Sequence, residues 1–173
     1  MASRIGVASL CGAAWNAAYH DNGKIAHRRM TPYVLLRGQS LSNAAFDADT
    51  HEWVFTFTGQ RVLRVAAPWR LLSDGTIVLG FEDDGQLFGL TTPIDANARI
   101  GRAVAGQEVI EVATNLTGDL DVHFGSGLRL QVFNGSCGYE GWQLFAPGQR
   151  CVVAQGGGRV IDSDDNPGLF PRK

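Results

Sequence analysis

The chain lacks the features that mark several large protein classes. No apolar run in its 173 residues reaches the roughly 18 residues of a membrane-spanning helix, so we expect no membrane association. Charged residues make up 18% of the chain, the net charge is −2, and no basic cluster extends beyond 27–29. That composition excludes nucleic acid as the expected partner.

Cysteine is scarce as well. The three cysteines, Cys11, Cys137 and Cys151, are an odd number and stand at no metal-ligand spacing. We therefore expect reduced thiols in a cytoplasmic protein, with no metal and no cofactor. His51-Glu52 and Asp83-Asp84 are too sparse to form a metal site and are typical of exposed turns.

What the chain does contain is an internal repeat. Segments 53–72 and 120–145 each hold two alternating apolar runs joined by a glycine-containing turn, followed by a run that begins with tryptophan. Phe57 and Phe124 are 67 residues apart (124 minus 57), and this offset holds through the second run. A repeated hairpin and tryptophan strand indicates a duplicated β unit.

The repeat is broken at one place. Trp69 and Trp142 are 73 residues apart (142 minus 69), so the second copy carries six extra residues before its tryptophan.

The fold class predicted from these patterns is all-β. We expect an antiparallel barrel or sandwich built from two duplicated β units, with one or two short helices. The duplicated domain is expected over 30–160. Residues 1–29 are Ala-rich and predict an N-terminal extension, a short helix over about 8–19 or irregular chain, and 161–173 form an acidic Pro-Gly tail.

Local patterns give finer predictions. Tyr33-Val-Leu-Leu36 reads as a short strand, and residues 39–50 read as a polar loop. Thr76–Phe81 and Gln86–Leu90 flank Asp83-Asp84-Gly85, which is typical of a hairpin. Pro93–Ile100 lacks β alternation and favours a short helical connection.

Several elements of the chain carry a family resemblance. They are Pro68-Trp-Arg-Leu71, Asp84-Gly-Gln86 with Phe88-Gly-Leu90, Pro93-Ile-Asp95, Gly138-Tyr-Glu-Gly-Trp142 and Gly156-Gly-Gly158. On these elements the chain resembles an uncharacterised family of small bacterial β proteins. Related proteins with the Tyr-Glu-x-Trp element look like members of bacterial toxin–immunity gene neighbourhoods, which implies protein binding rather than catalysis.

The candidate binding residues surround the two tryptophans. Trp69, Arg70, Tyr139, Glu140 and Trp142 would form an aromatic patch with a central carboxylate, suited to a basic partner or a small polar ligand. The alternative places both tryptophans in the core as repeated anchors. In either case an unpaired Glu140 would be costly beside Trp142, so we expect it to have a cationic partner or several amide partners, with Arg70 as the leading candidate.

Two further motifs resemble a catalytic turn and an anion-binding loop. Gly135-Ser-Cys-Gly138 is similar to the nucleophile turn of chymotrypsin-like cysteine proteases, but no histidine follows His123, so we expect no catalytic residue at Cys137. Gly156-Gly-Gly158 lacks the Lys and Ser/Thr of a phosphate loop and reads as a glycine-rich strand end.

The sequence therefore favours a non-enzymatic module that binds another protein, with a bacterial immunity protein as one form of it. The alternative is a small-ligand binding or hydrolytic β-barrel with a pocket near Trp69, Arg70, Tyr139 and Glu140. An exposed patch would favour the first, and a closed cavity the second.

Overall fold

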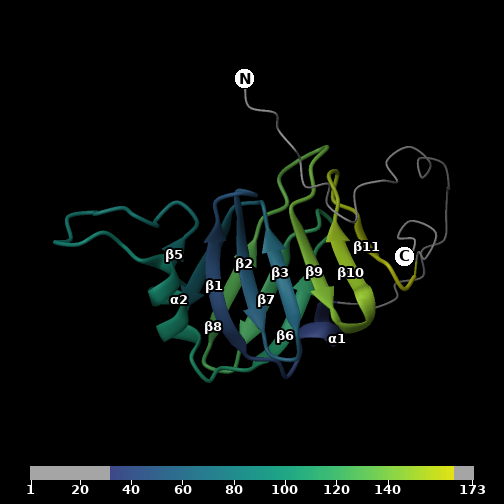
Figure 1. The fold of residues 1–173 in the computed structure, drawn as a ribbon, viewed down its shortest axis with the longest axis horizontal. Coiled ribbons are helices and arrows are strands. Elements are labelled where there is room, and N and C mark those ends of the chain that lie inside the picture. Colours follow the sequence, from purple (N-terminus) through teal and green to yellow (C-terminus); the bar gives the residue numbers. More distant parts are fainter. Residues whose placement is uncertain (1–31, 166–173) are drawn as a thin grey trace.

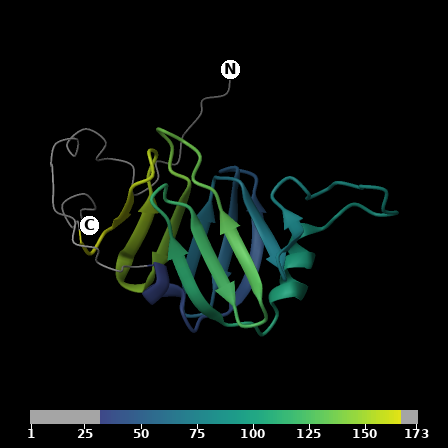
Figure 2. The ribbon, with the colours of Figure 1, turned by 180° about the vertical axis from the view of Figure 1, so that it is seen from behind.

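Two antiparallel β sheets pack face to face in the computed structural model, which describes residues 32–165 (Figure 1). The six-stranded sheet has the order β1 (Leu41–Asp47), β2 (Glu52–Phe57), β3 (Arg61–Val65), β9 (Trp142–Ala146), β10 (Arg150–Ala154), β11 (Val160–Asp162). The five-stranded sheet has the order β5 (Thr76–Gly80), β4 (Trp69–Ser73), β8 (Leu128–Val132), β7 (Leu120–Phe124), β6 (Val109–Thr114) (Figure 2). The sheets do not close into a barrel within 32–165, so the predicted all-β fold is a sandwich.

Two short α-helices lie beside edge strands of the sandwich. α1 (Pro32–Leu36) lies against β6, and α2 (Ala96–Val104) lies against β1 and β5. The Asp95 side chain caps α2 by accepting a hydrogen bond from the Ala98 N–H at 2.8 Å. A single 3₁₀ turn, η1 (Pro147–Gln149), joins β9 to β10.

The duplication is visible in the strand order. Each copy gives its hairpin to one sheet and its tryptophan strand to the other: β4 pairs with β8, and β9 pairs with β3. The order β1-β2-β3-β9-β10 therefore matches β6-β7-β8-β4-β5, element for element. The registers agree too, because Trp69 lies opposite Val132 as Trp142 lies opposite Val65.

The apolar alternation of the strands places one continuous core between the sheets. Inward side chains are almost completely buried and polar ones alternate outward, as period-two strands require. The largest fully buried side chains are Trp69, Trp142, Phe55, Phe57, Phe124, Leu36, Leu63, Leu79, Ile100, Leu120, Leu130 and Leu144.

Several local predictions were wrong. Residues 33–36 are helical, because Pro32 suits a first helical turn and Leu35 and Leu36 pack into the core. The expected loop 39–50 contains β1, whose weak β propensity is overridden by pairing with β2.

Other differences concern the two ends and the expected hairpin. Residues 86–90 form no strand, so β5 has no hairpin partner there. The strand β11 continues to Asp162, two residues into the segment assigned to the tail. The predicted N-terminal helix lies outside the described residues. None of the helices in the described range is long and apolar enough to cross a membrane.

Candidate functional site

The two tryptophans lie in the core, as the alternative interpretation of the sequence had it. Trp69 packs edge-on against Trp53, with ring centroids 4.9 Å apart. Trp142 donates a hydrogen bond from its ring N–H to the Gly118 carbonyl at 2.8 Å. Both side chains are fully buried, so neither forms part of a surface patch.

Arg70 does not pair with Glu140, so that expectation was wrong. Its Nε donates to the Gln131 side-chain oxygen at 2.9 Å, and its guanidinium lies 4.9 Å from the centre of the Phe133 ring. Because β4 pairs with β8, Gln131 is the cross-strand neighbour of Arg70. Arg70 is therefore held on the outer face of the five-stranded sheet.

Tyr139 and Glu140 do come together, in an open cleft of about 680 Å³ between the two connections that lead to the tryptophan strands. One wall is the short connection 66–68 of the first copy. The other is the connection 133–141 of the second copy, which contains the six extra residues and rises above β9 (Figure 1). The residues lining the cleft are Glu52, Ala66, Ala67, Pro68, Asn134, Gly135, Ser136, Gly138, Tyr139, Glu140, Gly141 and Gln143.

The longer connection is fixed by its neighbours. The Asn134 side-chain amide donates to the carbonyls of Thr117 and Gln155, both at 3.0 Å. The Gly157 N–H donates to the Ser136 carbonyl at 2.8 Å. An added Cβ at Gly156 would lie 2.5 Å from the Gly138 nitrogen, so only glycine permits this approach. The glycine run thus packs against the cleft wall.

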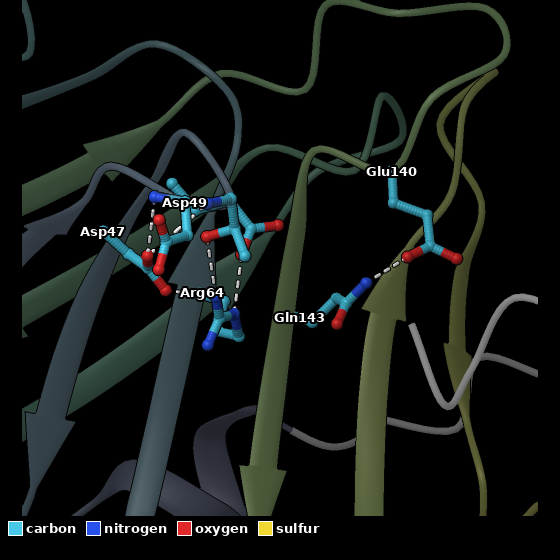
Figure 3. Close-up of polar contacts among 7 residues, drawn as sticks. Asp47, Asp49, Arg64, Glu140 and Gln143 are labelled. Atoms are coloured by element: carbon cyan, nitrogen blue, oxygen red, sulfur yellow. Dashed lines mark hydrogen bonds and ion pairs between the residues drawn. The ribbon is translucent and has the colours of Figure 1, made fainter. Parts of the chain in front are cut away.

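Glu140 is the carboxylate at the centre of the cleft. The Gln143 side-chain amide donates a hydrogen bond to it (Figure 3). Burial raises the pKa of Glu140 above its usual value; the Gln143 hydrogen bond opposes this shift, and the nearby Glu52 carboxylate adds to it. Within residues 32–165 no cationic side chain forms an ion pair with Glu140.

The guanidinium of Arg64, on the strand that pairs with β9, is already engaged. Arg64 binds Glu52 at 2.6 Å, Asp47 at 2.9 Å and the Thr50 hydroxyl at 2.8 Å, as a cluster separate from Glu140 (Figure 3). Hydrogen bonding to Arg64 is the main reason why the pKa of Asp47 is lowered. Arg64 is thus shared between two carboxylates, Asp47 and Glu52, and forms no ion pair with Glu140.

The remaining surface of the cleft is apolar and aromatic. Ala66, Ala67 and Pro68 supply aliphatic surface along one wall. Tyr139 stands at the other wall with 82% of its surface exposed. An exposed aromatic ring beside a carboxylate is suited to an extended cationic side chain, because the ring covers the aliphatic stem while the carboxylate pairs with the charge.

A family model described as a family of unknown function, DUF6188, matches residues 33–163. The chain belongs to this family. No curated protein and no solved structure gave a significant match.

Other reactive side chains of this DUF6188 protein lie outside the cleft. Cys137 is exposed and free but is not among the lining residues. His123 contacts Asp121 at 3.2 Å on the outer face of the five-stranded sheet. No group of three or more potential metal ligands occurs in the part of the chain that the structure describes.

Sequence reasoning missed Glu52 and Gln143 as lining residues. Glu52 begins β2, far from Glu140 in the chain, and it reaches the cleft only because β3 pairs with both β2 and β9. The signal that could have found the site is the six-residue insertion. Because the two copies are related by symmetry, the longer connection before Trp142 must lie near the matching, shorter connection before Trp69.

Proposed function

We propose that the protein is a non-enzymatic binding module whose cleft takes a lysine or arginine side chain of a partner protein. The observation that carries the proposal is Glu140, a half-buried carboxylate with no cationic partner in the described residues. A bound cation would supply the missing charge and recover part of the cost of burial.

The shape of the cleft supports a protein partner. It is open and bordered by the exposed Tyr139, so a side chain projecting from another surface can enter it. The residues that line it include no histidine and no cysteine, which favours binding over nucleophilic catalysis. The resemblance to immunity-type proteins adds one specific role to test, that of a factor which binds a toxin.

A small cationic ligand is the second candidate. A volume of about 680 Å³ lies within the roughly 300–1,000 Å³ range of small-molecule sites. Such a ligand would use the same carboxylate, so the two candidates differ only in whether the cation is part of a macromolecule.

The decisive variant is Glu140→Gln, which keeps the size of the side chain and removes its charge. We expect it to weaken binding of lysine- or arginine-containing peptides by about tenfold or more, since a charge-assisted hydrogen bond is lost. The measurement is fluorescence polarisation on a peptide array, with free arginine and a polyamine as small-molecule probes. Glu108→Gln, an exposed carboxylate outside the cleft, is the matched control.

The same variant should not be less stable. Because the pKa of Glu140 is raised in the folded state, the protonated side chain favours folding. This contribution to stability is complete below about pH 4.5 and is lost as the pH rises through the pKa of the folded state. At pH 7 Glu140→Gln should therefore melt at the wild-type temperature or slightly above it. The gain in the free energy of unfolding should be less than about 1 kcal/mol, because the group is half exposed to water.

Binding has the opposite dependence on pH. The carboxylate must be ionised to hold a cation, so affinity should fall as the pH drops through the raised pKa of Glu140. Equal peptide binding by wild type and Glu140→Gln, or affinity that rises on acidification, would refute the proposal.

A further inference from the structure

The cleft holds a second carboxylate besides Glu140. Glu52, the first residue of β2, lines the same cleft, and its charge is near enough to add to the raised pKa of Glu140. One oxygen of Glu52 accepts the hydrogen bond from Arg64, and one oxygen of Glu140 accepts that from Gln143. The second oxygen of each carboxylate has no partner within residues 32–165. Two half-satisfied carboxylates therefore border one cleft.

Positive charge is short around these carboxylates. The Arg64 guanidinium is divided between Asp47, at 2.9 Å, and Glu52, at 2.6 Å. Since one guanidinium serves two carboxylates, an ionised Glu140 adds negative charge that no ion pair within the described range offsets. A cation that enters the cleft would therefore be attracted by Glu52 and Glu140 together.

A third oxygen at the cleft also lacks a partner. Asn134 lines the cleft and is 8% exposed, and its amide nitrogen is fixed by two backbone carbonyls. Its Oδ1 accepts no hydrogen bond in the part of the chain that the structure describes. This oxygen lies against Gly141, the residue after Glu140, where an added Cβ would be 2.5 Å away. The three unpartnered oxygens are all acceptors, so a matching ligand brings several donors.

A guanidinium meets this demand better than an ammonium does. It carries five N–H donors in a planar fork, so its two edges can bind two separate carboxylates at once. An ammonium is a compact charge that holds its water more strongly. The chain itself contains such an arrangement, because Arg64 binds oxygens of Asp47, Glu52 and Thr50 together.

We propose that the cleft selects arginine over lysine, with the guanidinium of a partner protein placed between Glu52 and Glu140. One edge of the guanidinium binds the second oxygen of Glu52, the other edge binds that of Glu140, and the remaining N–H groups face the floor at Asn134. The aliphatic stem of the arginine lies along the exposed Tyr139 ring. This inference rests on the proposed function, in which the cleft takes a cationic side chain.

The first test compares three fluorescein-labelled peptides that differ at one residue, which is arginine, lysine or citrulline. Citrulline has nearly the shape of arginine but no charge. In fluorescence polarisation we expect wild type to bind the arginine peptide about tenfold or more tighter than the lysine peptide, and citrulline most weakly. Equal affinity for arginine and lysine, or a preference for lysine, would overturn this inference and leave the proposed function intact. Cationic peptides that bind no better than the citrulline peptide would refute the proposed function as well.

The second test removes the second carboxylate. Glu52→Gln should weaken binding of the arginine peptide by about tenfold or more and that of the lysine peptide by less, so the preference shrinks. Asp47→Asn is the matched control, because it removes the other carboxylate bound to Arg64 but does not line the cleft. Both variants leave Arg64 one carboxylate, so they should melt at similar temperatures. Wild-type preference in Glu52→Gln, or its loss in Asp47→Asn, would contradict the placement of the guanidinium.

Discussion

At the residue scale, the duplication gives the molecule two tryptophans in equivalent positions with different polar environments. Trp142 bonds to the buried Gly118 carbonyl, whereas the buried ring N–H of Trp69 has no partner in the described residues. The second copy therefore uses its tryptophan to tie down the β6–β7 turn. The first copy uses the same residue only for packing, against Trp53 and Phe55.

This difference allows a matched comparison of Trp→Phe substitutions at the two positions. Trp→Phe at either position removes a similar volume from the core, but only Trp142→Phe leaves a buried carbonyl unsatisfied. We expect Trp142→Phe to lower the free energy of unfolding by about 1–3 kcal/mol more than Trp69→Phe. Urea denaturation followed by circular dichroism measures both. If Trp69→Phe proved the more damaging, the hydrogen bond to Gly118 would not be the deciding contribution.

At the element scale, the candidate cleft arises where the two copies differ. The cleft exists because the connection before Trp142 is longer than the one before Trp69. The copies also differ after β5, which is followed by the long connection 81–95, whereas its counterpart β10 is followed by the short turn 155–159 and β11. The repeated parts build the sandwich, and the unrepeated connection before Trp142 supplies one wall of the cleft proposed for binding.

The cleft wall offers a prediction at this scale. Gly156→Ala would place a Cβ 2.5 Å from the backbone of Gly138, so one of the two segments must move. We expect a loss of about 1–3 kcal/mol in stability together with weaker peptide binding in the cleft. Gly101→Ala is the control, because an added Cβ there meets nothing within 4 Å and Gly101 does not line the cleft. Thermal melts and the peptide assay measure both effects, and a wild-type result for Gly156→Ala would mean that the approach is not restrictive.

The sequence predicted the elements that repeat and missed those that depend on tertiary contact. The constant offset of 67 residues locates the paired hairpins, and the insertion before Trp142 marks the cleft wall. β1 carries a polar, Ala-containing pattern and becomes a strand only through pairing with β2, so no local signal reveals it. Glu140 and Tyr139, both named from the sequence, line the cleft, but the expected pairing of Glu140 with Arg70 was wrong, because strand order decides which side chains face each other.

At the scale of the whole molecule, each sheet is built from both halves of the chain. β4 leaves the first copy to pair with β8, and β9 leaves the second copy to pair with β3. Neither half can complete a sheet or cover its apolar face alone. The sandwich should therefore fold as one cooperative unit, although its sequence contains two copies.

Cutting the chain in the connection between β5 and α2 tests this. A break between Thr91 and Thr92 interrupts no strand and no helix, and such exposed sites tolerate cleavage. Fragments 1–91 and 92–173 should each lack a cooperative thermal transition, because β4 and β8 are separated, as are β3 and β9. Mixed in equal amounts, they should recover the circular dichroism spectrum of the intact protein and a single melting transition. A fragment that melts cooperatively as a monomer would show that one copy is a folding unit by itself, and that the exchange of tryptophan strands is not what holds the two halves together.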